Sequence, residues 1–190
     1  MPNNLIRTLL LFSLVCSATA GQTNPPPSAS SWQTFIPKSG EFSVEMPGLP
    51  EHRVEPGSKP GDSMTFPLYH LITDTEVYAI GYLNVPRSGK TMDEQLESGL
   101  SHAVRRFVRK GGKEISKSKI KSSFGCPAVI WVGSNSEIPL LEARAFATPE
   151  RVYLLLCASL YTGQASRDTA GRFFDSFKVI GSPCEDEKLK

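Results

Sequence analysis

The stretch RVYLLLCASLY, residues 151–161, constrains the fold more than any other part of the chain. Its residues are apolar at consecutive positions, so an extended conformation would be apolar on both faces. Strands of that kind lie in the middle of a sheet that is covered on both sides. The stretch therefore predicts a layered fold, with other elements packed on each face of a sheet.

Alternating apolar and polar residues predict further strands around it. Phe42, Val44 and Met46 form one apolar face. The prolines of the segment 47–50 end that strand, and we expect the next strand, at 53–55, to be its neighbour. The remaining extended segments are 64–73 and 77–85, joined as a hairpin through 74–76, followed by 113–123, 128–134 and 139–148.

Two segments have the period of a helix. Thr91 and Glu94 form a capping box at the start of the first helix, and Gly111 with Gly112 ends it. Its predicted core face comprises Met92, Leu96, Leu100, Ala103, Val104, Phe107 and Val108. The second helix, at 166–177, turns towards the core the residues Ala170, Phe173, Phe174 and Phe177.

The order of these elements is strands, helix, strands, helix, with tight turns between successive strands. Tight turns join antiparallel neighbours, whereas parallel neighbours need long crossover connections. The chain is therefore predicted to be an α+β protein. Its sheet should be largely antiparallel and flanked by helices, as in an α/β/α sandwich.

The first twenty residues have the pattern of a secretory signal peptide. Arg7 precedes an apolar run from Leu9 to Val15, and Ala18-Thr19-Ala20 provides small residues for cleavage after Ala20. The run is shorter than the about 20 apolar residues of a transmembrane helix. Cys16 leaves lipid attachment open, although Val15 is larger than the residue such processing prefers. We expect an exported protein, periplasmic or secreted.

The rest of the chain divides into three parts. Residues 21–31 contain three consecutive prolines and no apolar period, which predicts a flexible leader. Residues 32–181 form a single domain, long enough for a core, and residues 182–190 form a C-terminal tail. The net charge is +2, and one Arg and no acidic residue precede residue 32. Global charge therefore selects no class of partner.

Several segments carry a resemblance to a known fold. WQTFIPKSGEFSVEMPGLP resembles the opening of small exported bacterial proteins of the PsbP/Mog1-like fold, and the likeness continues in YAIGYLNVP, RVYLLLCASL and RFFDSFKVIG. Most exported members of this family are uncharacterised. The wider fold includes the photosystem II extrinsic subunit and a binding partner of the GTPase Ran. The resemblance thus implies a binding or assembly role rather than a reaction.

The sequence contains no compact catalytic or metal-binding motif. His52, His70 and His102 lack the short spacing of metal ligands. Cys126 or Cys157 with His70 would supply a thiol nucleophile and a base, yet Cys157 falls in an apolar strand, where a thiol is usually buried and inert. We therefore predict no catalytic, cofactor-binding or metal-binding residue and no cofactor.

A cluster of basic residues is the strongest charge feature. Seventeen residues contain eight cations and only one acid, Glu114; the cations are Arg105, Arg106, Arg109, Lys110, Lys113, Lys117, Lys119 and Lys121. On a strand the last three would project to one side. A solvated helix face and a lysine-protected edge strand explain this basic segment without a function. The alternative is a binding surface for an acidic protein, anionic lipid or envelope polymer, with nucleic acid not expected.

Three cysteines remain after cleavage, so an oxidising compartment allows one disulfide. Cys157 lies in the predicted central strand and is the natural unpaired residue. Cys126 stands at a strand entrance, and Cys184 lies in a tail that is free to reach it. We predict a disulfide between Cys126 and Cys184.

These features predict an exported, non-enzymatic binding or assembly module at the cell envelope. The alternative is a hydrolase or metal-dependent enzyme whose site is assembled from residues distant in sequence. A cleft with converging polar side chains of shifted pKa would favour the enzyme, and a basic face would favour the binding module.

Overall fold

The computed structural model describes residues 32–56, 65–84, 91–123, 125–160 and 163–181. The predicted signal peptide 1–20, leader 21–31 and tail 182–190 lie outside these residues, so the predictions made for them stay predictions. Neither helix in the described part of the chain is both long and apolar enough to cross a membrane.

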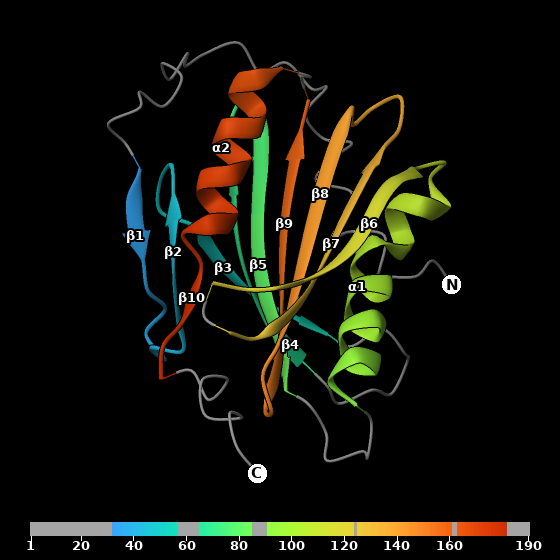
Figure 1. The fold of residues 1–190 in the computed structure, drawn as a ribbon. Coiled ribbons are helices and arrows are strands. Elements are labelled where there is room, and N and C mark those ends of the chain that lie inside the picture. The colour runs from blue at the N-terminus through green and yellow to red at the C-terminus, as the bar shows by residue number, and fades with distance from the viewer. Residues whose placement is uncertain (1–31, 57–64, 85–90, 124, 161–162, 182–190) are drawn as a thin grey trace.

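Seven strands form one sheet in the order β3-β4-β5-β9-β8-β7-β6 (Figure 1). Every neighbouring pair in it is antiparallel. The predicted α+β class with a largely antiparallel sheet is thus confirmed. The strands are β3 (Glu51–Pro56), β4 (Thr65–Ile72), β5 (Glu76–Asn84), β6 (Lys113–Lys121), β7 (Pro127–Ser134), β8 (Leu140–Ala147) and β9 (Arg151–Ser159).

Strand β9 lies in the middle of this sheet and is covered on both faces, as its sequence predicts. Tyr153, Leu155 and Cys157 belong to the buried cluster on one face. Val152 and Ala158 belong to the buried cluster on the other. Because side chains alternate along a strand, β9 contributes residues to two separate cores.

Two helices cover opposite faces of the sheet (Figure 1). Helix α1 (Met92–Arg109) packs over β7, β8 and β9, and helix α2 (Gln164–Asp175) packs on the other face. Of the predicted core residues of both helices, Met92 and Ala103 are partly buried, Val108 is exposed, and the others are buried. Val108 is 47% exposed, because it follows the buried Phe107 by one residue and thus points about 100° away around the helix.

The first strand of the predicted pattern belongs to a second, smaller sheet. β1 (Gln33–Phe35) and β10 (Lys178–Val179) pair on either side of β2 (Phe42–Met46). The prediction that the strands before and after the prolines of 47–50 are neighbours is therefore wrong. Strand β2 instead packs its apolar face onto the core beneath α2, and the proline segment leads from this covering sheet to the edge strand β3.

Candidate binding surface on α1 and β6

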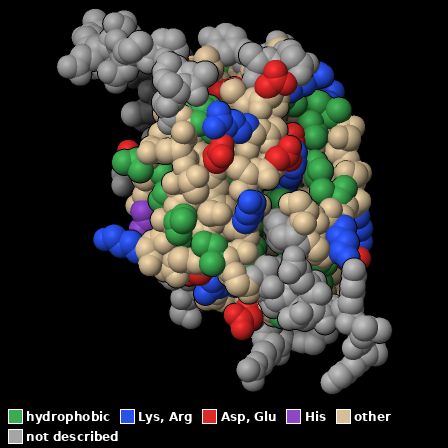
Figure 2. All heavy atoms as spheres, turned by 60° about the vertical axis from the view of Figure 1, so that its left-hand side comes forward, with side chains coloured by type: hydrophobic (Ala, Val, Ile, Leu, Met, Phe, Trp, Pro, Cys, Tyr) green, Lys and Arg blue, Asp and Glu red, His purple; other side chains and the backbone are tan. Residues whose placement is uncertain are grey.

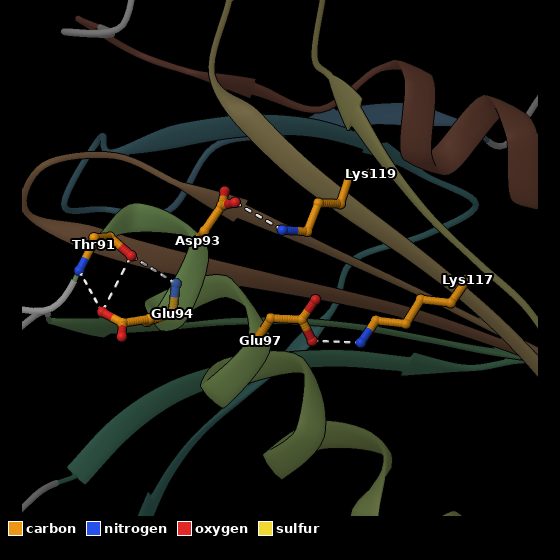
Figure 3. Close-up of polar contacts among 6 residues, drawn as sticks. All are labelled: Thr91, Asp93, Glu94, Glu97, Lys117 and Lys119. Atoms are coloured by element: carbon orange, nitrogen blue, oxygen red, sulfur yellow. Dashed lines mark hydrogen bonds and ion pairs between the residues drawn. The ribbon is translucent and has the colours of Figure 1, made fainter.

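The start of α1 is fixed by the predicted capping box (Figure 3). The backbone N–H of Thr91 donates to Oε2 of Glu94 at 2.8 Å, and the backbone N–H of Glu94 donates to Oγ1 of Thr91 at 3.3 Å. Asp93 and Glu94 also place negative charge in the first turn, where the helix dipole favours it. The helix therefore begins with an acidic, well-defined end.

The end of α1 is a tight glycine turn that leads directly into β6. Gly111 has a positive φ of 85°, and the N–H of Gly112 donates to the carbonyl of Phe107 at 3.0 Å. A Cβ at Gly112 would lie 2.2 Å from the ring of Phe107, so only glycine fits there. The last turn of α1 and the first residues of β6 consequently share one end of the molecule, at the upper right of Figure 1.

Strand β6 is an edge strand with every residue exposed. Lys117 is opposite Trp131, Lys119 is opposite Val129, and Lys121 is opposite Pro127. Trp131 and Val129 are buried in the cluster under α1. The three lysines therefore project to one side, as predicted, and that side carries α1.

Two of these lysines are paired with acids of α1 (Figure 3). Lys119 Nζ lies 2.7 Å from Asp93 Oδ2, and Lys117 Nζ pairs with Glu97. The hydrogen bond and the charge of Asp93 raise the pKa of Lys119. Both pairs can form at once because the spacing of the acids nearly equals that of the lysines. Asp93 and Glu97 are four residues apart, a rise of about 6 Å along a helix, and Lys117 and Lys119 are two residues apart, a rise of about 6.6 Å along a strand.

The only acid within the basic segment has another partner. Glu114 Oε2 accepts a hydrogen bond from the indole Nε1 of Trp131 at 2.7 Å. This bond ties the start of β6 to β7. The neutralising acids of this surface are therefore those of α1, which lie outside the basic segment.

Exposed positive charge is left at the turn between α1 and β6. We call Arg105, Arg109, Lys110 and Lys113 the basic tip; all four are exposed. Within the described residues none of them forms an ion pair, in contrast to Lys117 and Lys119. The side chain of Arg106 is not among those described. The structure thus divides the basic segment into two paired lysines, Lys117 and Lys119, and an unpaired tip, while Lys121 forms no ion pair with a described residue.

Another face of the described surface is mixed in charge. Figure 2 brings the β1 and β2 side forward, and basic and acidic side chains are interspersed over this face. Ion pairs occur there too, such as that between Arg172 Nε and Glu45 Oε2 at 2.6 Å. The basic tip therefore differs in its charge from this face.

The thiol alternative finds no support in the geometry. Cys126 is disulfide-bonded, and Cys157 is a buried free thiol. Burial, followed by the charges of Glu76 and Glu142, raises the pKa of Cys157 above its ordinary value. The registers also place His70 and Cys157 on opposite faces of the sheet, since His70 aligns with Leu156 through Ala79. Cys157 and His70 cannot act together as nucleophile and base.

One cysteine of the predicted disulfide lies outside the described residues. Cys184 is not among the described residues, so its predicted bond to Cys126 stays a prediction. Within the described chain no group of three His, Cys, Asp or Glu is placed to hold a metal ion.

Two polar clusters, one buried around Glu76 and one partly buried around Glu41, were missed from the sequence because their members are far apart in it. Glu76 accepts hydrogen bonds from the hydroxyls of Tyr78, at 2.8 Å, and Thr169, at 2.7 Å, which joins β5 to α2. Glu41 accepts from the hydroxyl of Tyr82 at 2.8 Å, which joins the small sheet to the large one. Both carboxylates connect layers of the fold.

The arrangement of two helices on opposite faces of an antiparallel sheet defines the chain as an α+β domain. The solution structure of cyanobacterial PsbP (CyanoP) from Synechocystis sp. PCC 6803 is similar over 86% of this chain and 98% of that chain, with a TM-score of 0.53 and 14% identity. The predicted fold is confirmed. No protein-family model matches the chain, and no curated protein matches it. Likeness at this identity shows fold and not function.

Proposed function

We propose that this protein is a non-catalytic accessory domain, exported to the cell envelope, that binds an anionic partner through its basic tip. The observation that carries the proposal is the separation of charge on the α1 and β6 surface. Lys117 and Lys119 are neutralised by α1, whereas the four cations of the tip point into solvent without an ion pair in the described chain.

Structural roles account for only part of this charge. Cations in the last turn of a helix favour its dipole, which explains Arg109 and Lys110. Lysines that protect an edge strand from aggregation explain those of β6. Lys113 is the first residue of β6 and so falls under the edge-strand explanation, whereas Arg105 lies a turn earlier in α1, where neither role accounts for its charge.

A PsbP-like fold supports a non-catalytic role by analogy only. The thiol form of the enzyme alternative is not favoured, because Cys126 is disulfide-bonded and Cys157 lies on the opposite face of the sheet from His70. A binding role needs only an accessible, complementary surface, which the basic tip provides.

The test is a pull-down from an envelope fraction with matched charge reversals. The tip variant is Arg109→Glu, Lys110→Glu and Lys113→Glu. The control reverses three exposed cations elsewhere, Lys38→Glu, Arg167→Glu and Lys178→Glu, and so changes the net charge equally. Lys117 and Lys119 are left unchanged, since their reversal would place acids against Asp93 and Glu97.

The tip variant should lose binding at low salt, and the control should keep it, because the interaction is between charges on one surface. Equal retention by both variants would contradict the proposal. Circular dichroism of each variant shows whether the fold is kept.

A further inference from the structure

Two exposed aliphatic side chains stand among the cations of the basic tip. Val108 is 47% exposed, and Ile115 is 61% exposed. On α1 a residue lies beside those three and four positions away, so Val108 shares a helix face with Arg105. Ile115 lies at the register shift of β6 between Glu114 and Ser116, where a bulge re-aims a side chain out of the regular ladder.

The combination of Lys, Arg and aliphatic residues selects among anionic partners. Protein interfaces are depleted in Lys and obtain much of their binding energy from Trp, Tyr and Arg. The exposed large hydrophobic residues of the described chain are all aliphatic. An anionic bilayer instead attracts Lys and Arg to its headgroups and accepts aliphatic side chains at the boundary with the acyl chains.

The form of the tip fits a surface contact. It is a tight turn at one end of the molecule, and its exposed residue Gly111, where a Cβ would meet nothing within 4 Å, has no side chain that would hold a flat surface away. Arg105, Arg109, Lys110 and Lys113 surround this turn. Headgroups could thus approach the cations while the two aliphatic side chains reach past them.

We infer that the basic tip docks on an anionic lipid bilayer, with its cations at the headgroups and with Val108 and Ile115 inserted at the interface. The inference rests on the proposed function and names its anionic partner as lipid. The proposed contact is peripheral and is made by the turn between α1 and β6. Binding should therefore be reversible and sensitive to both salt and lipid charge.

Vesicle co-sedimentation of the full chain tests this. One set of vesicles is phosphatidylcholine alone, and the other contains about a third phosphatidylglycerol. All variants keep residues 1–31, so any contribution of that segment is common to them. Wild type should bind the anionic vesicles more tightly, and the tip variant should bind them about a hundredfold more weakly, at roughly fivefold for each cation.

A second pair of variants tests insertion. Val108→Ser with Ile115→Ser should weaken binding to anionic vesicles about tenfold, because less apolar surface leaves water. The control is Ile36→Ser with Ile180→Ser, which removes aliphatic side chains of similar exposure, 53% and 49%, from outside the tip. The control should bind like wild type.

The outcomes separate the inference from the proposed function. Equal binding to both kinds of vesicle, or equal loss in the two serine variants, would overturn the lipid inference. So would an envelope pull-down that depends on the tip while no vesicle binds, and in that case the proposed function stands with an acidic protein or polymer as partner. A pull-down that is indifferent to the tip would overturn both.

Discussion

Tyr82, on the large sheet, is linked to the small sheet through the carboxylate of Glu41. Its hydroxyl donates to Glu41, which directly precedes β2, and the guanidinium of Arg151 lies 4.8 Å from its ring centroid. Arg151 Nη1 also lies 3.4 Å from Glu41 Oε1. The three residues come from three separate parts of the chain, so neither spacing nor period in the sequence could predict them.

Replacement of Tyr82 by Phe should lower stability and change its pH dependence. Burial, with the hydrogen bond to Glu41, raises the pKa of Tyr82 from 10.0 to about 12. A raised pKa means that the neutral hydroxyl stabilises the fold fully below pH 10, and that this contribution is lost as the pH rises through about 12. Loss of the hydrogen bond should cost about 1 kcal/mol at neutral pH.

Urea unfolding across this pH range measures both effects. The variant should lose stability less steeply than wild type between pH 10 and 12, because one titrating group is gone. Identical slopes for the two proteins would show that Tyr82 does not contribute in this way.

At the scale of single elements, the capping box of α1 is a local signal that the sequence shows completely. Thr91 and Glu94 lie within one turn, and their reciprocal hydrogen bonds follow from that spacing. Thr91→Ala should reduce the free energy of unfolding by about 1 kcal/mol. Ser98→Ala, on an exposed position of the same helix, should be neutral or slightly stabilising because alanine is the better helix former. Thermal unfolding of both variants is the measurement, and an equal effect would argue against the cap.

The contact between α1 and β6 is an element-scale feature that the sequence hides. Lys117 is 20 residues from Glu97, and Lys119 is 26 residues from Asp93. A signal was nevertheless present: two acids four apart on the helix, followed by two lysines two apart on the next strand. This pattern predicts the two ion pairs only when it is known which residues of the strand lie beside which residues of the helix.

Reversal of Lys117 and Lys119 to Glu should lower the Tm, because four carboxylates would then meet on one surface. Lys121→Glu should change the Tm little, since no described acid pairs with Lys121. Adding Asp93→Lys and Glu97→Lys to the double reversal should restore the Tm. Failure of this charge swap to rescue stability would contradict the pairing.

At the scale of the whole molecule, the large sheet and its two covering helices could be predicted from periodicity, whereas the small sheet could not. β1 has 3 residues and β10 has 2, which is too short for an alternating pattern to appear. Strand β2 could be recognised, but its partners come from opposite ends of the domain. The sequence likewise predicted the positive charge of the candidate site. It did not predict which cations are paired, because the acids that pair with Lys117 and Lys119 lie 20 and 26 residues away in the chain.

The thiols set a further whole-molecule prediction. Cys126 is disulfide-bonded and Cys157 is free, and we predict that Cys184 is the partner of Cys126. Such a bond would close a loop of nearly sixty residues and stabilise the fold by about 3 to 4 kcal/mol. Peptide mapping without reductant should recover the two cysteines in one linked fragment. A fragment that links Cys126 to any other cysteine would refute the assignment.

The central claim is that the turn between α1 and β6 is the surface that meets the partner. Acetylation of lysines on the wild-type protein, with and without an envelope fraction, tests it without any mutation. Lys110 and Lys113 should become protected in the presence of the fraction, while the exposed Lys38 and Lys178 should react equally under both conditions. Protection of Lys38 or Lys178 in place of the tip lysines, or no protection at all, would contradict the account.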